Sequence, residues 1–106
     1  MSDTTAAAGL APLVRALAKR SRAQPILENA RSTPWSSITF TGARHRFSLR
    51  FESDRAARHA HAMCDGLNYA EFELGAHLLV DIAILDNRVS ATGCTLTVEA
   101  LTIAND

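Results

Sequence analysis

Nine consecutive residues, 43–51, alternate between apolar and polar side chains without a break. A period of two is typical of a β-strand with one face against a core, whereas a helix would place apolar residues three and four positions apart. One face comprises Ala43, His45, Phe47, Leu49 and Phe51, and the other comprises Arg44, Arg46, Ser48 and Arg50. The segment therefore predicts a strand that buries Phe47, Leu49 and Phe51 and leaves its arginines in solvent.

Two further segments before residue 90 show strand patterns. Residues 36–41 alternate through Ile38 and Phe40, and Gly42 is placed for a tight turn. In residues 71–84 the expected inward set is Phe72, Leu74, Ala76, Leu78, Val80, Ile82 and Ile84, and the outward set is Glu71, Glu73, Gly75, His77, Leu79, Asp81 and Ala83. This run is longer than an average strand, so Gly75 is expected to mark a bend or a bulge.

The C-terminal strand is predicted over residues 94–103, after a turn region at 86–93. Cys94, Leu96, Val98 and Ala100 share one face. At Leu101 and Ile103 the apolar positions move to the other face. The change indicates either a bulge or a strand that is covered on both sides near its end.

Two segments show helical spacing. The first begins near Ala11–Pro12, carries Leu10, Leu13, Val14 and Leu17 on one side, and ends before Pro25. The second follows Ser53, a candidate N-cap, and carries Ala56, Ala60, Met63 and Leu67 on one side. Gly66 is expected to end it in the left-handed conformation. Residues 25–35 are predicted to be a connection.

The predicted order is helix, strand, strand, helix, strand, strand. One-sided helices and strands favour an α+β two-layer sandwich, with a four-stranded, mostly antiparallel sheet and both helices on one face. A circularly permuted ferredoxin-like arrangement and a simple meander both satisfy this order. We expect a flexible N-terminus over residues 1–9 and a single domain over residues 10–106.

The composition is that of an ordinary globular domain, 47% apolar and 21% charged. Two cysteines, Cys64 and Cys94, are too few for a disulfide framework and are expected to be buried free thiols. No apolar run reaches the ~20 residues of a membrane span, so no membrane partner is expected. The chain is expected to be cytoplasmic; its acid-poor, Arg-bearing start leaves a mitochondrial transit peptide as the alternative.

Charge is divided between the two halves of the chain. Residues 1–50 carry eight basic and two acidic side chains, and residues 51–106 carry three basic and nine acidic ones. The neutral total thus combines a half of +6 with a half of −6. Such a division indicates pairing within one fold, pairing between two copies, or a pole reserved for a partner.

Motifs for catalysis are absent from the sequence: there is no nucleophile elbow, no Gly-rich phosphate loop and no CxxC pair. His59, His61 and Cys64 are close in sequence, but spacings of two and five point helical side chains apart. His77 and Asp81 would lie about 13 Å apart on a strand, too far for direct contact. We therefore predict no catalytic residues, no metal and no cofactor.

The candidate binding residues are Arg44, Arg46, Arg50 and His77. The expected outward set also includes Leu79, Ala83 and Leu85, an apolar patch beside charges of both signs, which favours a non-enzymatic module that forms a homodimer through its sheet. One alternative is anion or nucleic-acid binding by the arginines, although Glu71, Glu73 and Asp81 are expected to neutralise them and no aromatic residue is expected beside them. The other is a small ligand-binding domain or enzyme with His45 or His77 in its pocket.

Overall fold

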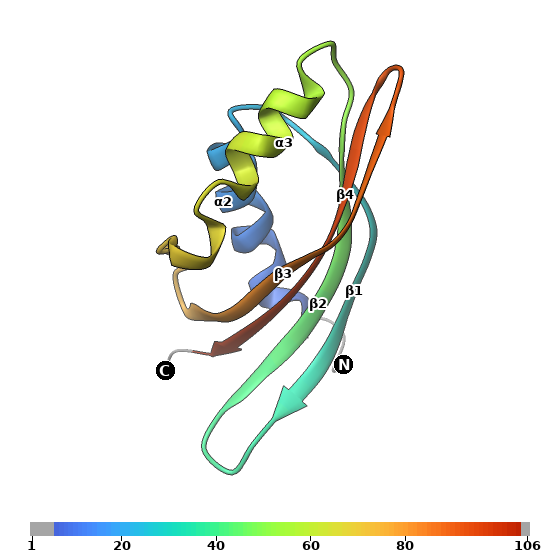
Figure 1. The fold of residues 1–106 in the computed structure, drawn as a ribbon. Coiled ribbons are helices and arrows are strands. Elements are labelled where there is room, and N and C mark those ends of the chain that lie inside the picture. The colour runs from blue at the N-terminus through green and yellow to red at the C-terminus, as the bar shows by residue number, and fades with distance from the viewer. Residues whose placement is uncertain (1–5, 105–106) are drawn as a thin grey trace.

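The computed structural model describes residues 6–104. The elements follow the order η1 (Ala7–Gly9), α2 (Leu10–Ser21), β1 (Ile26–Ser36), β2 (Thr41–Phe51), α3 (Ala56–Cys64), η2 (Leu67–Tyr69), β3 (His77–Ser90) and β4 (Gly93–Ala104). The four strands form one antiparallel sheet in the order β1-β2-β4-β3, and α2 and α3 lie on one side of it (Figure 1). The α+β class and the order of elements are confirmed. A meander would place β3 beside β2, so the sheet has the permuted ferredoxin-like order.

The core lies between the two helices and the central strands β2 and β4. The prediction that Phe47, Leu49 and Phe51 are buried is confirmed. From the other elements the core takes Leu13, Leu17, Ala56, Ala60, Met63, Cys94, Leu96, Val98 and Ala100. Both helices therefore present the apolar stripes that their spacing predicts.

Each helix caps the C-terminal end of the other. Arg20 of α2 donates from Nε to the carbonyl oxygen of Met63, at 3.1 Å, and from Nη2 to the carbonyl oxygen of Asp65. In return, His59 of α3 donates from Nδ1 to the carbonyl oxygen of Ser21, at 2.7 Å. The last carbonyl groups of a helix have no hydrogen-bond partner within that helix. These contacts therefore supply partners for carbonyl groups at the end of each helix and also hold the two helices together.

The first strand differs from the prediction. Residues 26–36 are β1 rather than a connection, and the predicted strand over 36–41 contains the turn. The turn is closed by Ser37, whose N–H donates to the Phe40 carbonyl at 2.8 Å and whose Oγ accepts from the Phe40 N–H at 3.1 Å. β1 has a neighbour on one side only and is largely exposed, so no alternation of apolar residues marks it, and an edge strand tolerates Pro34.

Gly42 lies inside β2 and not in the turn. It pairs with Ile103 of β4, and a Cβ on Gly42 would lie 1.9 Å from the carbonyl oxygen of Thr102. The two backbones therefore approach too closely at this point for any other residue.

The third strand begins at His77, later than predicted, and continues to Ser90 through the predicted turn region. Residues 70–76 form a loop, in which Gly75, at a φ of 67°, makes the tight turn between Leu74 and His77. The pairing of β3 with β4 shifts register at Val80 and again at Leu85, and each shift is a β-bulge. Because an extra residue reverses the alternation, the predicted outward positions of Leu79 and His77 are wrong, and both face the helices.

The predicted face of β4 is confirmed, and its end is covered on both sides. The pairing of β2 with β4 runs without a shift of register, so no bulge explains the apolar residues Leu101 and Ile103. Thr102 between them continues the inner face. Gly66 adopts the left-handed conformation after α3, as predicted, and of the predicted flexible stretch residues 1–5 lie outside the described residues while 7–9 form η1.

Candidate interaction face

The sheet has an outer face, defined here as the side opposite α2 and α3, and the strand registers order it into rows. The apolar row runs across all four strands through Trp35, Gly42, Ile103 and Leu78. Two rows further along, the charged row runs through Arg31, Arg46, Glu99 and Ala83. Thr33, Arg44, Leu101 and Asp81 lie between them.

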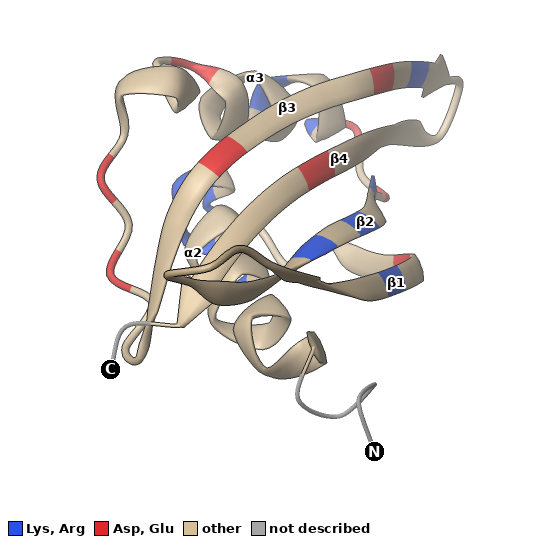
Figure 2. Cartoon of the chain, turned by 90° about the horizontal axis from the view of Figure 1, so that it is seen from below, with Lys and Arg blue, Asp and Glu red and all other residues tan. Residues whose placement is uncertain are grey.

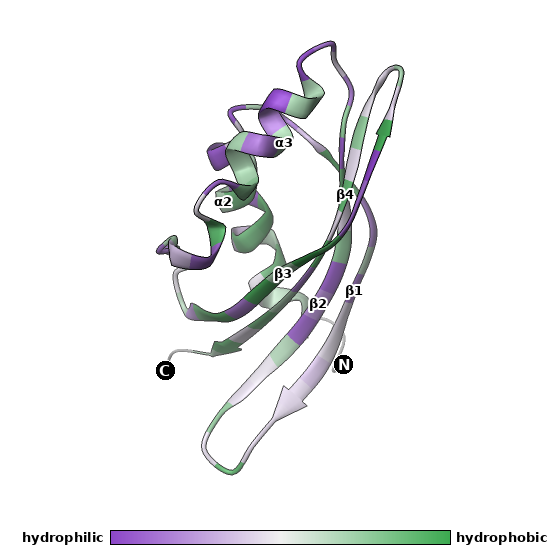
Figure 3. Cartoon of the chain, viewed as in Figure 1, coloured by the Kyte–Doolittle hydropathy of each residue, from purple (hydrophilic) through white to green (hydrophobic). Residues whose placement is uncertain are grey.

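The apolar row continues the hydrophobic first half of β3 (Figure 3). Trp35 lies directly opposite Gly42, so an aromatic residue is paired with a glycine across the two strands. Leu101 and Ile103 are each 9% exposed although neither helix covers this side. Leu78 and Val80 beside them are about half exposed, at 46% and 53%. The face therefore has an apolar end where β1 and β2 approach their hairpin turn.

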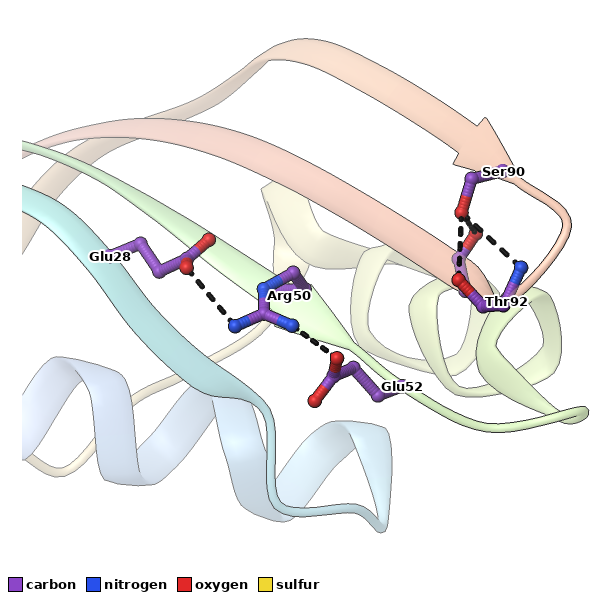
Figure 4. A network of polar contacts seen from close by, with 6 residues as sticks. Glu28, Arg50, Glu52, Ser90 and Thr92 are labelled. Atoms are coloured by element: carbon purple, nitrogen blue, oxygen red, sulfur yellow. Dashed lines mark hydrogen bonds and ion pairs between the residues drawn. The ribbon is translucent and has the colours of Figure 1, made fainter.

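The three candidate arginines all lie on the outer face of β2, as predicted. Arg44 pairs with Glu99 at 3.6 Å, and Arg50 lies between Glu28, at 3.2 Å, and Glu52 (Figure 4). The hydrogen bond that Arg50 donates to Glu28 is the main cause of a raised pKa at Arg50. No carboxylate within residues 6–104 is within ion-pair distance of Arg46.

The carboxylates beside these arginines differ from those predicted. Glu71 and Glu73 lie in the loop before β3, not on the sheet, so they do not neutralise the stripe. Asp81 is on the outer face, opposite Leu101. Two of the three arginines are paired instead with Glu28, Glu52 and Glu99, and Arg46 has no carboxylate within ion-pair distance among residues 6–104.

Charge on the outer face is divided by strand. The basic positions are concentrated on β1 and β2, at Arg31, Arg44, Arg46 and Arg50, and the acidic ones on β4 and β3, at Glu99, Asp81 and Asp86 (Figure 2). Glu28 and Arg88 are the exceptions. The division between the halves of the sequence therefore becomes a division between the two sides of the sheet.

Two residues of this face were missed from the sequence. Arg31 and Trp35 belong to β1, which was predicted to be a connection. An edge strand that is exposed on both faces need not alternate apolar and polar residues. Residues 26–36 therefore contain no pattern from which a strand, and the positions of Arg31 and Trp35 in it, could be predicted. They add a basic and an aromatic side chain to a face that was expected to have no aromatic residue.

His77 and His45 lie away from the arginines, near the inner face. His45 is fully buried; its Nδ1 lies 2.7 Å from Oγ of Ser32 and its Nε2 lies 2.8 Å from Oγ1 of Thr102. Burial, and next the charge of His77, lower the pKa of His45. The side chain is thus a neutral imidazole held across three strands by two hydroxyl groups.

The surroundings of His45 favour a structural role. The adjacent cavity, about 130 Å³, is bordered by His77 and Thr102 but not by Ser32, so the hydroxyl nearest to Nδ1 does not face a space for substrate. Burial raises the pKa of both free thiols, Cys64 and Cys94, which keeps them protonated. Across residues 6–104, no three His, Cys, Asp or Glu side chains are grouped as a metal site would need.

Comparison with known proteins found no matching family model, no matching curated protein and no matching solved structure. Within the described part of the chain, no helix has the length and apolar character needed to cross a membrane.

Proposed function

We propose that this chain is a non-enzymatic assembly module that forms a homodimer through the outer face of its sheet. The observation that carries the proposal is the division of charge across the charged row. Arg46 is on β2, Glu99 is its direct neighbour on β4, and these are the two central strands of the sheet.

A two-fold axis parallel to the strands makes this row complementary to itself. Such an axis places β2 of one protomer over β4 of its partner, so Arg46 faces the partner's Glu99 and Glu99 faces the partner's Arg46. An axis across the strands would instead place Arg46 over the partner's Arg46. Like charges oppose association, so the first orientation is favoured.

The apolar row supports the same orientation. With the axis along the strands, Trp35 faces the partner's Leu78 and Gly42 faces the partner's Ile103. Exposed apolar patches rimmed by charge are typical of interaction sites, and aromatic residues are enriched at their centres. Face-to-face packing would remove from water the half-exposed side chains at this end of the sheet.

A charge exchange tests the proposal by analytical ultracentrifugation. Arg46→Glu and Glu99→Arg each bring like charges together across the two-fold axis, and each should weaken the dimer by about tenfold or more. The double variant restores opposite charges and should recover the dimer, as should a mixture of the two single variants. The matched control is Arg15→Glu, an exposed site on α2, which should change nothing.

Thermal unfolding of each variant separates lost association from lost folding, because Glu99 also pairs with Arg44 within the chain. A wild-type species of 11.4 kDa at high micromolar concentration would refute the proposal. Dissociation of the double variant to the same extent as the single ones would refute the orientation.

Nucleic-acid binding is the second candidate, because Arg31 and Trp35 join Arg44 and Arg46 on one face. An aromatic platform beside guanidinium groups is the arrangement that single strands use. Against it, Arg44 and Arg50 are paired with carboxylates, and Glu99, Asp81 and Asp86 share the face. Fluorescence anisotropy with a labelled oligonucleotide at about 50 mM salt should therefore detect no binding. Micromolar affinity that is lost on replacing Arg31 and Arg46 with alanine would reverse this ranking.

A further inference from the structure

β3 is an edge strand with an open side. In the sheet it pairs with β4 alone. Its other edge is bridged only at its first residue, His77, to Leu74, and from Leu78 to Ser90 that edge makes no backbone hydrogen bond to the rest of residues 6–104. Such a row of free N–H and C=O groups is a template for another strand. The opposite edge, β1, is interrupted by Pro34 and by a bulge at Asn29, whose φ is 53°. β3 also has bulges, at Val80 and Leu85, but it contains no proline, so no N–H group is missing from its backbone.

A groove runs beside β3, between the strand and the segment formed by α3 and η2. Its first part is a cavity of about 440 Å³, bordered by Ile82 and Ile84 of the strand and by Leu67 and Tyr69 of η2. Its second part is a cavity of about 320 Å³, bordered by Asn87, Val89, Ala57 and His61. Cys64 borders both parts, so the two cavities follow one another along the strand.

Large side chains at the groove are left in solvent. Tyr69 is 92% exposed and Val89 is 71% exposed, and each borders one of the two cavities. Tyrosines that become buried on association are among the residues that contribute most to binding. The groove therefore has an exposed aromatic at its first part and an exposed aliphatic at its second.

The surroundings of this edge are acidic. Asp81 and Asp86 lie on β3 itself, Asp65 follows α3, and the loop that leads to the strand carries Glu71 and Glu73; all five are exposed. Arg88 is the basic residue of β3, and it pairs with Asp86 at 2.9 Å. A second copy of β3 would bring two acidic edges together, whereas a basic strand would be complementary.

We propose that the open edge of β3 binds an extended peptide segment with alternating basic and apolar side chains. The backbone of the segment adds a fifth strand to the sheet, its apolar side chains enter the groove between β3 and Tyr69, and its basic side chains face the surrounding carboxylates. Strand addition of this kind takes affinity from main-chain hydrogen bonds and specificity from pockets for alternate side chains. Asp81 and Asp86 also belong to the outer face, but the backbone edge and the groove of this site lie apart from Arg46 and Glu99, on which the proposed dimer depends.

The test is an NMR titration of the full chain with a capped peptide of alternating Lys and Val, about eight residues long, which is enough to follow the exposed strand. Shifts should be confined to β3, η2 and the end of α3, and amides on the free edge of β3 should exchange more slowly. A peptide of alternating Glu and Val should bind at least about tenfold more weakly. Shifts centred on α2 or on the outer face would overturn the proposal.

Backbone methylation separates strand addition from simple attraction of charges. Alternate residues of a strand direct their N–H groups to opposite edges. Of two peptides, N-methylated at all lysines or at all valines, one should therefore lose binding and the other should keep it. Equal binding by both would show that charge alone holds the peptide, and the proposal would be wrong. The absence of binding at millimolar peptide would also overturn it.

Variants of the chain complete the test. Tyr69→Ala should weaken peptide binding by about tenfold, because the substitution removes the aromatic surface that would contact the peptide at the groove. The matched control is Ile38→Ala, which removes an exposed apolar side chain at the β1–β2 turn and should leave binding unchanged. Arg46→Glu should weaken the dimer without weakening the peptide complex, so failure of one proposal is distinguishable from failure of the other. Equal effects of the Tyr69 and Ile38 variants would refute the groove as the site.

Discussion

Replacing Thr102 with valine should destabilise the fold by about 1–3 kcal/mol, the cost of leaving a buried polar group without its partner. Thr102 is 1% exposed, and its Oγ1 lies 2.8 Å from Nε2 of His45, which is itself inaccessible to water. Valine keeps the branched shape of threonine but removes the hydroxyl, so the ring nitrogen has nothing to bond. For a domain of this size the loss is a large part of a total stability of about 5–15 kcal/mol.

Urea denaturation measures the effect, and a double-mutant cycle assigns it. In a His45→Leu background the same Thr102→Val change should cost less than about 0.5 kcal/mol, because no imidazole remains to be orphaned. The matched control is Thr95→Val, on the same strand but on its outer face, which should stay within about 0.5 kcal/mol of wild type. A Thr102→Val loss of equal size in both backgrounds would refute the argument, because the hydrogen bond would then not be its source.

Three further outcomes follow from the same structure. The free energy of unfolding should fall as pH decreases below 6.5, because His45 stays neutral in the fold while the same residue of the unfolded chain takes up a proton, and the fall should continue to the lowered pKa of His45. Denaturation measured from pH 7.5 to 5.5 gives this dependence. If the free energy of unfolding of the His45→Leu variant changed with pH as steeply as that of the wild type, the explanation would be wrong. Phe47→Ala should cost about 3–5 kcal/mol as a core truncation, and a loss below about 1 kcal/mol would argue against its burial. Gly42→Ala should separate β2 from β4, lowering stability by about 1–3 kcal/mol or more, and an unchanged melting temperature would show that the backbones can move apart.

Both helices, the central strands and the fold class could be predicted from the sequence. The alternation through Phe47 and Leu49, and that through Leu96 and Val98, are set by residues that follow one another along the chain. Each of these strands has a neighbour on both sides and a helix layer above it, so the pattern of burial repeats with the period of the backbone. The arginines of the candidate face were found for the same reason.

The edge strands and their contribution to the outer face were decided by the tertiary structure. β1 is exposed along most of its length, so nothing in its sequence had to alternate, and Trp35 and Arg31 were not placed. In β3, two bulges reverse the faces, and whether a bulge forms depends on pairing with β4, which lies later in the chain. The sequence shows that one half of the chain is basic and the other acidic. That basic and acidic side chains lie next to each other on one sheet, however, depends on the pairing of β4 with β2. That pairing is a contact between distant residues, and no local pattern specifies it.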